Sequence, residues 1–183
     1  MFIFEEITRH RERDPSENPW VNGPPAPETI RIVPYNPQWP RRFQALAAVV
    51  ATALGDLAVD IEHIGSTSVP GLAAKNVIDI VLTVADPREE TSYVPPLEGL
   101  GYRLTVREPS FHEHRCLRLA VPRVNLHVFA PDCAETIRLR MFRDWLRTNE
   151  NMARCPIPPR SVQEPCRSPP GRSEVLGQPA VGT

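Results

Sequence analysis

The segment EHIGSTSVPGLAAKNVIDI, from Glu62 to Ile80, combines a small hydroxyl-rich turn with a lysine and with an aspartate that interrupts an apolar run. Lys75 is the only lysine in a chain whose lysine and arginine residues total 21. Arginine does not replace lysine where a compact, mobile ammonium group is required. The segment therefore makes Lys75 a candidate for binding a phosphate group, between a candidate turn and a candidate carboxylate.

The turn GSTS, residues 65–68, has two interpretations. Glycine allows a close approach of the backbone to a ligand, and the N–H groups and hydroxyls that follow it would form a cradle for phosphate. Alternatively, the turn is structural, and its hydroxyls cap the next short helix. On the first interpretation the phosphate-binding residues are Gly65, Ser66, Thr67 and Ser68.

Two apolar segments, NVIDIVLTV (76–84) and RVNLHVF (123–129), carry the other candidates. Alternation along a strand places Asp79 on one face, and it places Asn125 and His127 together on one face of the second strand. An unpaired carboxylate is costly to bury, so Asp79 must meet a cation, a metal ion or hydrogen-bond donors. If the strands are neighbours, Asp79 and His127 converge as catalytic candidates; the alternative is a structural hydrogen bond between them.

Arg118 lies in HRCLRLAV (114–121), which together with residues 123–129 predicts a β-hairpin. Its side chain points away from Leu117 and Leu119, because neighbouring residues of a strand face opposite sides. Arg118 is therefore a candidate for binding phosphate, as arginine pairs well with phosphate oxygens. A solvated arginine is the alternative.

The chain has 183 residues, a net charge of −1 and 41% hydrophobic residues, which predicts one domain with flanking segments. This balance indicates neither a DNA-binding nor a membrane-binding surface, and no apolar run approaches the ~18 residues that span a bilayer. Without a recognisable secretory signal, the expected location is the cytoplasm. The four cysteines lack the spacing of a zinc site or a disulfide framework.

Two proline-rich segments flank a central region of the chain. Residues 1–29 and 155–183 are predicted to be a disordered N-terminal arm and a disordered tail. Residues 30–154 are predicted to form an α+β domain, with a helix between Asn36 and Gly55, strands at 59–64, 76–84 and 102–106, and the hairpin. A closing helix over 135–154 is expected to turn Met141 and Trp145 inward.

The globular part resembles the GrpB family, of the nucleotidyltransferase-like superfamily, over residues 30–154. The resemblance is carried in order by IRIVPYNPQWPRRFQAL, HIGSTSVPGLAAKNVIDI, LGYR, NLHVF and FRDWLR. It implies a nucleotidyltransferase-like core, with a mixed sheet and helices mainly on one face. It also implies that the Gly65–Ser66 turn holds a triphosphate and that Asp79 binds Mg²⁺. Val81 occupies the place of a second acid, and His127 or Asn125 that of a third.

The resemblance implies transfer of a nucleotidyl group to an unknown small acceptor, with His127 as a metal ligand or proton carrier. An alternative is a catalytically inactive module that binds a nucleotide or another phosphorylated metabolite. A further alternative is an accessory domain that assists a protein partner in folding or assembly, because some relatives are fused to dephospho-CoA kinase. For the first two alternatives the expected ligand is a nucleotide or another phosphorylated small molecule, for the third it is a protein partner, and neither DNA nor a membrane is expected.

Overall fold

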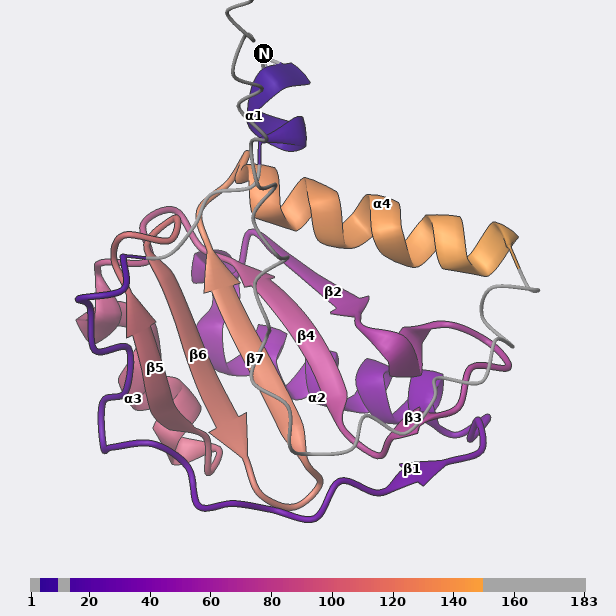
Figure 1. The fold of residues 1–183 in the computed structure, drawn as a ribbon. Coiled ribbons are helices and arrows are strands. Elements are labelled where there is room, and N and C mark those ends of the chain that lie inside the picture. The colour runs from indigo at the N-terminus through magenta and orange to yellow at the C-terminus, as the bar shows by residue number, and fades with distance from the viewer. Residues whose placement is uncertain (1–3, 10–13, 150–183) are drawn as a thin grey trace, which may run out of the picture.

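The computed structural model describes residues 4–9 and 14–149, and in this part of the chain it contains one five-stranded sheet and one two-stranded sheet (Figure 1). The order of the large sheet is β2-β4-β7-β6-β5, and β1 pairs with β3 in the small one. The strands are β1 Ile32–Val33, β2 Asp60–Ile64, β3 Ala74–Lys75, β4 Ile78–Thr83, β5 Arg103–Glu108, β6 His114–Leu119 and β7 Val124–Phe129.

The large sheet is mixed, as predicted. Strand β4 pairs with β7 in parallel, whereas β2 with β4, β6 with β7 and β5 with β6 are antiparallel. The predicted hairpin is confirmed as β6 and β7, in which Arg118 lies opposite Asn125 and Cys116 opposite His127. The parallel register places Asp79 opposite Asn125, and Val81 opposite His127.

Helices α2 (Trp39–Leu54) and α3 (Glu90–Gly99) cover one face of the sheet, which we call the helix face (Figure 1). Helix α2 follows a turn at Asn36, whose side-chain oxygen accepts a hydrogen bond from the N–H of Gln38 at 2.9 Å. It ends at Gly55, where φ is 53°. The main apolar core lies between these helices and the sheet, and its fully buried members include Trp39, Val50, Tyr93, Leu97, Ile80, Leu82, Leu117, Leu126 and Val128.

The opposite face, which we call the polar face, is covered in part by α4 (Ala134–Thr148), which lies across its β2 edge (Figure 1). A small apolar cluster of Ile64, Val81, Phe129 and Cys133 lies beneath it, with Leu139 of α4 packed against the cluster. Two helices therefore cover one face and one helix part of the other, which confirms the expected distribution.

The prediction that Met141 and Trp145 point inward is wrong: they are 59% and 45% exposed. Helix α4 instead directs arginines at the sheet. The guanidinium of Arg143 donates to Glu62 Oε2 at 3.1 Å, and that of Arg147 donates to the carbonyl of Ser68 at 2.9 Å. These contacts of the arginines with Glu62 and with the Ser68 carbonyl, which apolar spacing does not reveal, orient the helix.

The N-terminal segment has little regular structure, but residues 14–29 follow a defined path past the edge strand β5. The N–H of Val21 donates to the carbonyl of Thr105, and the N–H of Arg107 donates to the carbonyl of Pro19. An edge strand offers unpaired backbone groups, and two hydrogen bonds to β5 fix the path of this segment, whose sequence has no periodic pattern. Helix α1 spans Phe4–Thr8. The predicted tail at 155–183 lies outside the described residues.

Among the described residues, no helix is long and apolar enough to cross a membrane.

Candidate functional site

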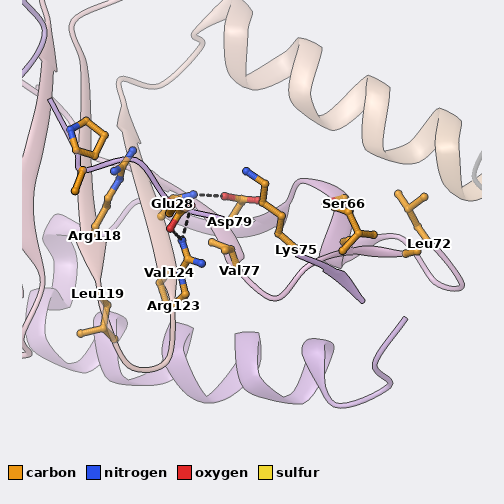
Figure 2. A pocket seen from close by; sticks show the side chains of 16 residues that line it. Glu28, Ser66, Leu72, Lys75, Val77, Asp79, Arg118, Leu119, Arg123 and Val124 are labelled. Carbon is orange, nitrogen blue, oxygen red and sulfur yellow. Dashed lines mark hydrogen bonds and ion pairs between the residues drawn. The ribbon is translucent and has the colours of Figure 1, made fainter. Parts of the chain in front are cut away.

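A cavity of about 530 Å³ lies on the polar side, near the start of β4 and β7 (Figure 2). The small sheet, the end of the hairpin and the N-terminal segment enclose it. It is lined by Pro25, Ala26, Glu28, Ile32, Ser66, Leu72, Ala73, Ala74, Lys75, Val77, Asp79, Arg118, Leu119, Arg123, Val124 and Asn125. The fold therefore brings together Ser66, Lys75 and Asp79 of the segment 62–80 with Arg118 of the predicted hairpin.

Gly65 fixes the turn against the strand carboxylate. It has a φ of 69°, and a Cβ atom added to it would lie 2.5 Å from Asp79 Oδ2. Any larger residue would therefore be strained in its backbone and would collide with the carboxylate. The following residues form a short 3₁₀ helix, η2 (Ser66–Ser68), and among them Ser66 faces the cavity.

Thr67 and Ser68 do not reach the cavity, because their hydroxyls are used inside the fold. Thr67 Oγ1 lies 3.1 Å from His63 Nε2, and Ser68 Oγ donates to the carbonyl of Gly65 at 2.6 Å. Both residues are buried. The structural interpretation of the turn therefore holds for the hydroxyls of Thr67 and Ser68, and Ser66 remains the candidate for contact with a ligand.

Asp79 has a hydrogen-bonded partner in Asn125, which sequence analysis placed on one face with His127 and, with His127, at the position of the third acid. Asn125 Nδ2 donates to Asp79 Oδ1 at 2.8 Å across the parallel pair β4–β7. Burial raises the pKa of Asp79, while the hydrogen bond from Asn125 and the charge of Lys75 act in the opposite direction. Asp79 is therefore a desolvated carboxyl group that lines a cavity, and such groups are found at binding and catalytic sites.

The cations of the cavity differ in how they are paired. Arg123 donates to both carboxylate oxygens of Glu28, at 2.9 and 2.7 Å, and the two side chains lie next to each other in the lining (Figure 2). The ammonium of Lys75 has no hydrogen bond or ion pair with any described residue. The Nε atom of Arg118 is buried and makes no hydrogen bond with a described residue, although its guanidinium lies over the Trp20 ring, 6.0 Å from the centroid, and acts on the thiol of Cys116.

No local pattern signalled Glu28 or Arg123, because the contact between them joins the predicted arm to the hairpin. Only the tertiary fold brings these two side chains into one wall. Long-range ion pairs of this kind have no spacing rule, in contrast to pairs on one helix.

His127 lies on the same face as Asp79 but outside the cavity lining. It is opposite Val81, and its Nδ1 lies 3.0 Å from Nε2 of His114. The direct hydrogen bond between Asp79 and His127 that the sequence suggested is not formed among the described residues. The strand register instead places Asn125 opposite Asp79, and Asn125 donates the hydrogen bond. Burial, with smaller contributions from His114 and Arg118, lowers the pKa of His127 to about 3.

The residues present do not fit a magnesium centre built by the protein alone. Among the described residues, no group of three or more His, Cys, Asp or Glu side chains is arranged to hold a metal ion. Mg²⁺ prefers octahedral oxygen ligands, and Asp79 lies beside the ammonium of Lys75. Binding of Mg²⁺ at Asp79 stays a prediction that would require ligand oxygens and water.

The family model described as GrpB protein matches residues 29–155. The UPF0157 protein BH1888 of Halalkalibacterium halodurans is 47% identical over 123 residues, which are 67% of this chain and 63% of that protein. The UPF0157 protein SCO7215 of Streptomyces coelicolor is 42% identical over 129 residues, covering 70% of this chain and 67% of that protein.

A crystal structure of the conserved protein GrpB from Enterococcus faecalis is similar with a TM-score of 0.59 and 30% identity. The similarity covers 67% of this chain and 76% of that one. A dephospho-CoA kinase of Mycolicibacterium paratuberculosis is 41% identical over 76 residues, which are 40% of this chain and 19% of the kinase. The matched part of this chain thus spans less than two thirds of BH1888 and a small part of the kinase.

Proposed function

This chain belongs to the GrpB protein family, and we propose that the cavity on the polar face of its sheet binds a phosphorylated small molecule. Arg118 and Lys75 bind the phosphate through their positive charges, and the hydroxyl of Ser66 donates a hydrogen bond to it. Asp79, held by Asn125, contacts a polar group of the ligand beyond the phosphate. Nucleotides and other phosphorylated metabolites belong to this class of ligand.

The unpartnered guanidinium nitrogen of Arg118 carries this proposal. A buried donor without an acceptor costs about 1–3 kcal/mol, and a phosphate oxygen is the acceptor that arginine pairs with most strongly. The ammonium of Lys75, which has no ion pair with a described residue, lines the same cavity from the small sheet. Two cations that form no ion pair with the described residues of one concave site favour an anionic ligand.

The side chains that line the cavity restrict the chemical class of the ligand further. Apart from the charged and the uncharged polar residues, the lining is aliphatic and includes Ile32, Leu72, Val77, Leu119 and Val124. No aromatic side chain is found among the described lining residues, so the cavity offers no ring for stacking on a nucleobase. A phosphate joined to an aliphatic chain therefore fits these walls better than a phosphate joined directly to a nucleoside.

The test is calorimetric titration of the full chain with dephospho-CoA, ATP and inorganic phosphate, each with and without Mg²⁺. Dephospho-CoA carries phosphates and an aliphatic chain, and it appears in the name of a relative. We expect dephospho-CoA to bind more tightly than inorganic phosphate. We expect Arg118→Gln to weaken binding at least about tenfold, which corresponds to ~1.4 kcal/mol.

Arg103→Gln is the matched control, since Arg103 lies opposite Arg118 on β5 but does not line the cavity. It removes the same charge and should change the affinity less than about twofold, as expected for an exposed charge. Equal weakening by the two variants would indicate a diffuse charge effect and contradict the proposed site. Absence of binding by all three ligands to the folded protein would end the proposal.

Nucleotidyl transfer is the second candidate, and the position of Asp79 in the same cavity as the cations favours it. It is tested by incubation with nucleoside triphosphates and Mg²⁺ and by measuring released pyrophosphate. If transfer occurs, Asp79→Asn should abolish pyrophosphate release and retain most of the binding. Binding without pyrophosphate release would leave the chain as a binding module.

A further inference from the structure

Residues 23–30, which we call the strap, pass along the cavity between two anchored ends (Figure 1). Before the strap, the N–H of Val21 donates to the carbonyl of Thr105 on β5, and after it β1 pairs with β3. Every residue of the strap is exposed, and three of the eight are prolines, which have no N–H to donate to a sheet. The strap is therefore attached at its ends and lacks a buried anchor between them.

One side chain, that of Glu28, attaches the middle of the strap to the rest of the described chain. Its two carboxylate oxygens accept hydrogen bonds from the guanidinium of Arg123 (Figure 2). The side chains of Glu28 and Arg123 are 53% and 51% exposed. Because ion pairs this exposed are weak, another anion can replace Glu28 on Arg123 at little cost.

The pair lies on the boundary between two cavities. A second cavity of about 280 Å³ is lined in part by Glu28, Lys75 and Arg123, and these three side chains also line the main cavity. Separation of Glu28 from Arg123 would therefore open the guanidinium to the main cavity and to the second one.

The carboxylate of Glu28 lies where the positive charges of the cavity act together. The hydrogen bond and the charge of Arg123 lower the pKa of Glu28, and the charges of Lys75 and Arg118 contribute in the same direction. Lys75 and Arg118 are the two cations of the proposed phosphate site. An anion at the place of the carboxylate is thus favoured by all three cations.

The charges of the lining show what Glu28 does to an incoming anion. The main cavity has three cationic side chains, Lys75, Arg118 and Arg123, and two carboxyl groups, those of Glu28 and Asp79. Without Glu28, the cations would exceed the carboxyl groups by two. This excess matches a phosphate monoester, which carries a charge of about −1.5 to −2 near neutral pH. Such an anion also attracts a guanidinium more strongly than a carboxylate does.

We propose that Arg123 is a further phosphate-binding residue and that Glu28 is a built-in competitor, whose carboxylate the phosphate of the ligand displaces. This inference rests on the proposed function, because it needs a phosphorylated ligand in the cavity. The phosphate oxygens replace the carboxylate oxygens on Arg123, and the strap moves outward with Glu28 while its ends stay attached. A ligand with a single carboxylate gains little from the exchange, so the strap makes the site selective for phosphate.

Calorimetric titration of the full chain with dephospho-CoA tests the displacement in a double-mutant cycle. Glu28→Gln should tighten binding about two- to fivefold, because it removes a weak exposed competitor. In the Arg123→Gln background the same substitution should change the affinity less than about 1.5-fold, since no guanidinium is left to compete for. Arg123→Gln in the Glu28→Gln background should weaken binding about tenfold.

Glu98→Gln is the matched control for charge. Glu98 is partly exposed, lies 4.0 Å from Arg103 in an ion pair and does not line the cavity. Its substitution removes the same charge as Glu28→Gln and should change the affinity less than about 1.5-fold. Circular dichroism checks that each variant is folded, and Glu28→Ala provides a second removal of the carboxylate.

The possible results separate this inference from the proposed function. Equal tightening by Glu28→Gln in both backgrounds would mean that Glu28 only repels the ligand through space, and it would overturn the displacement. No tightening in either background would overturn it as well. In both cases a loss of affinity in Arg118→Gln would leave the proposed function standing. Absence of binding by the wild type and by all folded variants would end both proposals.

Discussion

The helix face and the polar face of the same sheet are built from alternate residues of the same strands, yet they serve different ends. On β4 and β7, Ile80 and Leu126 face the helices and are fully buried, whereas Asp79 and Asn125 face the cavity. One face gains its free energy from the removal of apolar surface from water. The other holds desolvated polar groups whose partners are incomplete.

This contrast indicates which residues mainly stabilise the fold and which are available to bind a ligand. Buried polar groups normally find partners, and an unpaired charged group that lines a cavity favours a ligand there. Arg118 Nε, on the polar face, is such an atom. Substitutions on the helix face should therefore act on the free energy of unfolding, and those on the polar face mainly on ligand binding.

The largest expected effect compares neighbours on β7. Leu126→Ala should destabilise the fold by about 2–5 kcal/mol, because it opens a cavity in a fully buried core. Asn125→Ala should cost less, about 1–3 kcal/mol, since it leaves Asp79 without its hydrogen-bond donor. Urea unfolding followed by circular dichroism measures both values. A larger loss for Asn125→Ala would contradict the division between the faces.

The next effect concerns the turn that presses against the polar face. Gly65→Ala should destabilise by about 1–3 kcal/mol, from a left-handed backbone conformation and from the collision with Asp79. Gly71→Ala is the control: its φ is 79°, but an added Cβ would meet nothing within 4 Å. Thermal unfolding of the two variants separates backbone strain from the collision. Equal losses would show that Asp79 and the turn are not in close contact.

The smallest effect is a stabilisation. Burial raises the pKa of Asp79, so the fold favours its protonated form, and this contribution to stability is lost as the pH rises through that raised pKa. Asp79→Asn should therefore be more stable than the wild type at pH 7, by up to about 1 kcal/mol. The difference should vanish as the pH falls toward the ordinary value of 3.8.

Asp86→Asn provides the opposite sign for that measurement. A hydrogen bond from Arg88 lowers the pKa of Asp86 to about 2, so its contribution is present above pH 3.8 and is lost as the pH falls through about 2. This variant should be less stable than the wild type at pH 7. If Asp79→Asn is also less stable at pH 7, the carboxylate is not under desolvation strain.

Local patterns predicted most of the elements, because period and capping are properties of short segments. The helix between Asn36 and Gly55, strand β4 and the hairpin are found where the sequence placed them. Patterns failed on α4, where arginine contacts rather than apolar spacing orient the helix, and they did not predict that residues 14–29 run along the edge strand β5. In both cases the deciding contacts join residues far apart in the chain.

The sequence by itself determined the α+β elements, the family and the candidates Ser66, Lys75, Asp79 and Arg118, since residue type and spacing are written in it. Only the tertiary structure decided that Asp79 pairs with Asn125, that Thr67 and Ser68 turn inward, and that His127 lies at hydrogen-bond distance from His114. Strand register makes these choices. Register depends on the packing of the whole sheet, and a shift by one residue would exchange its two faces.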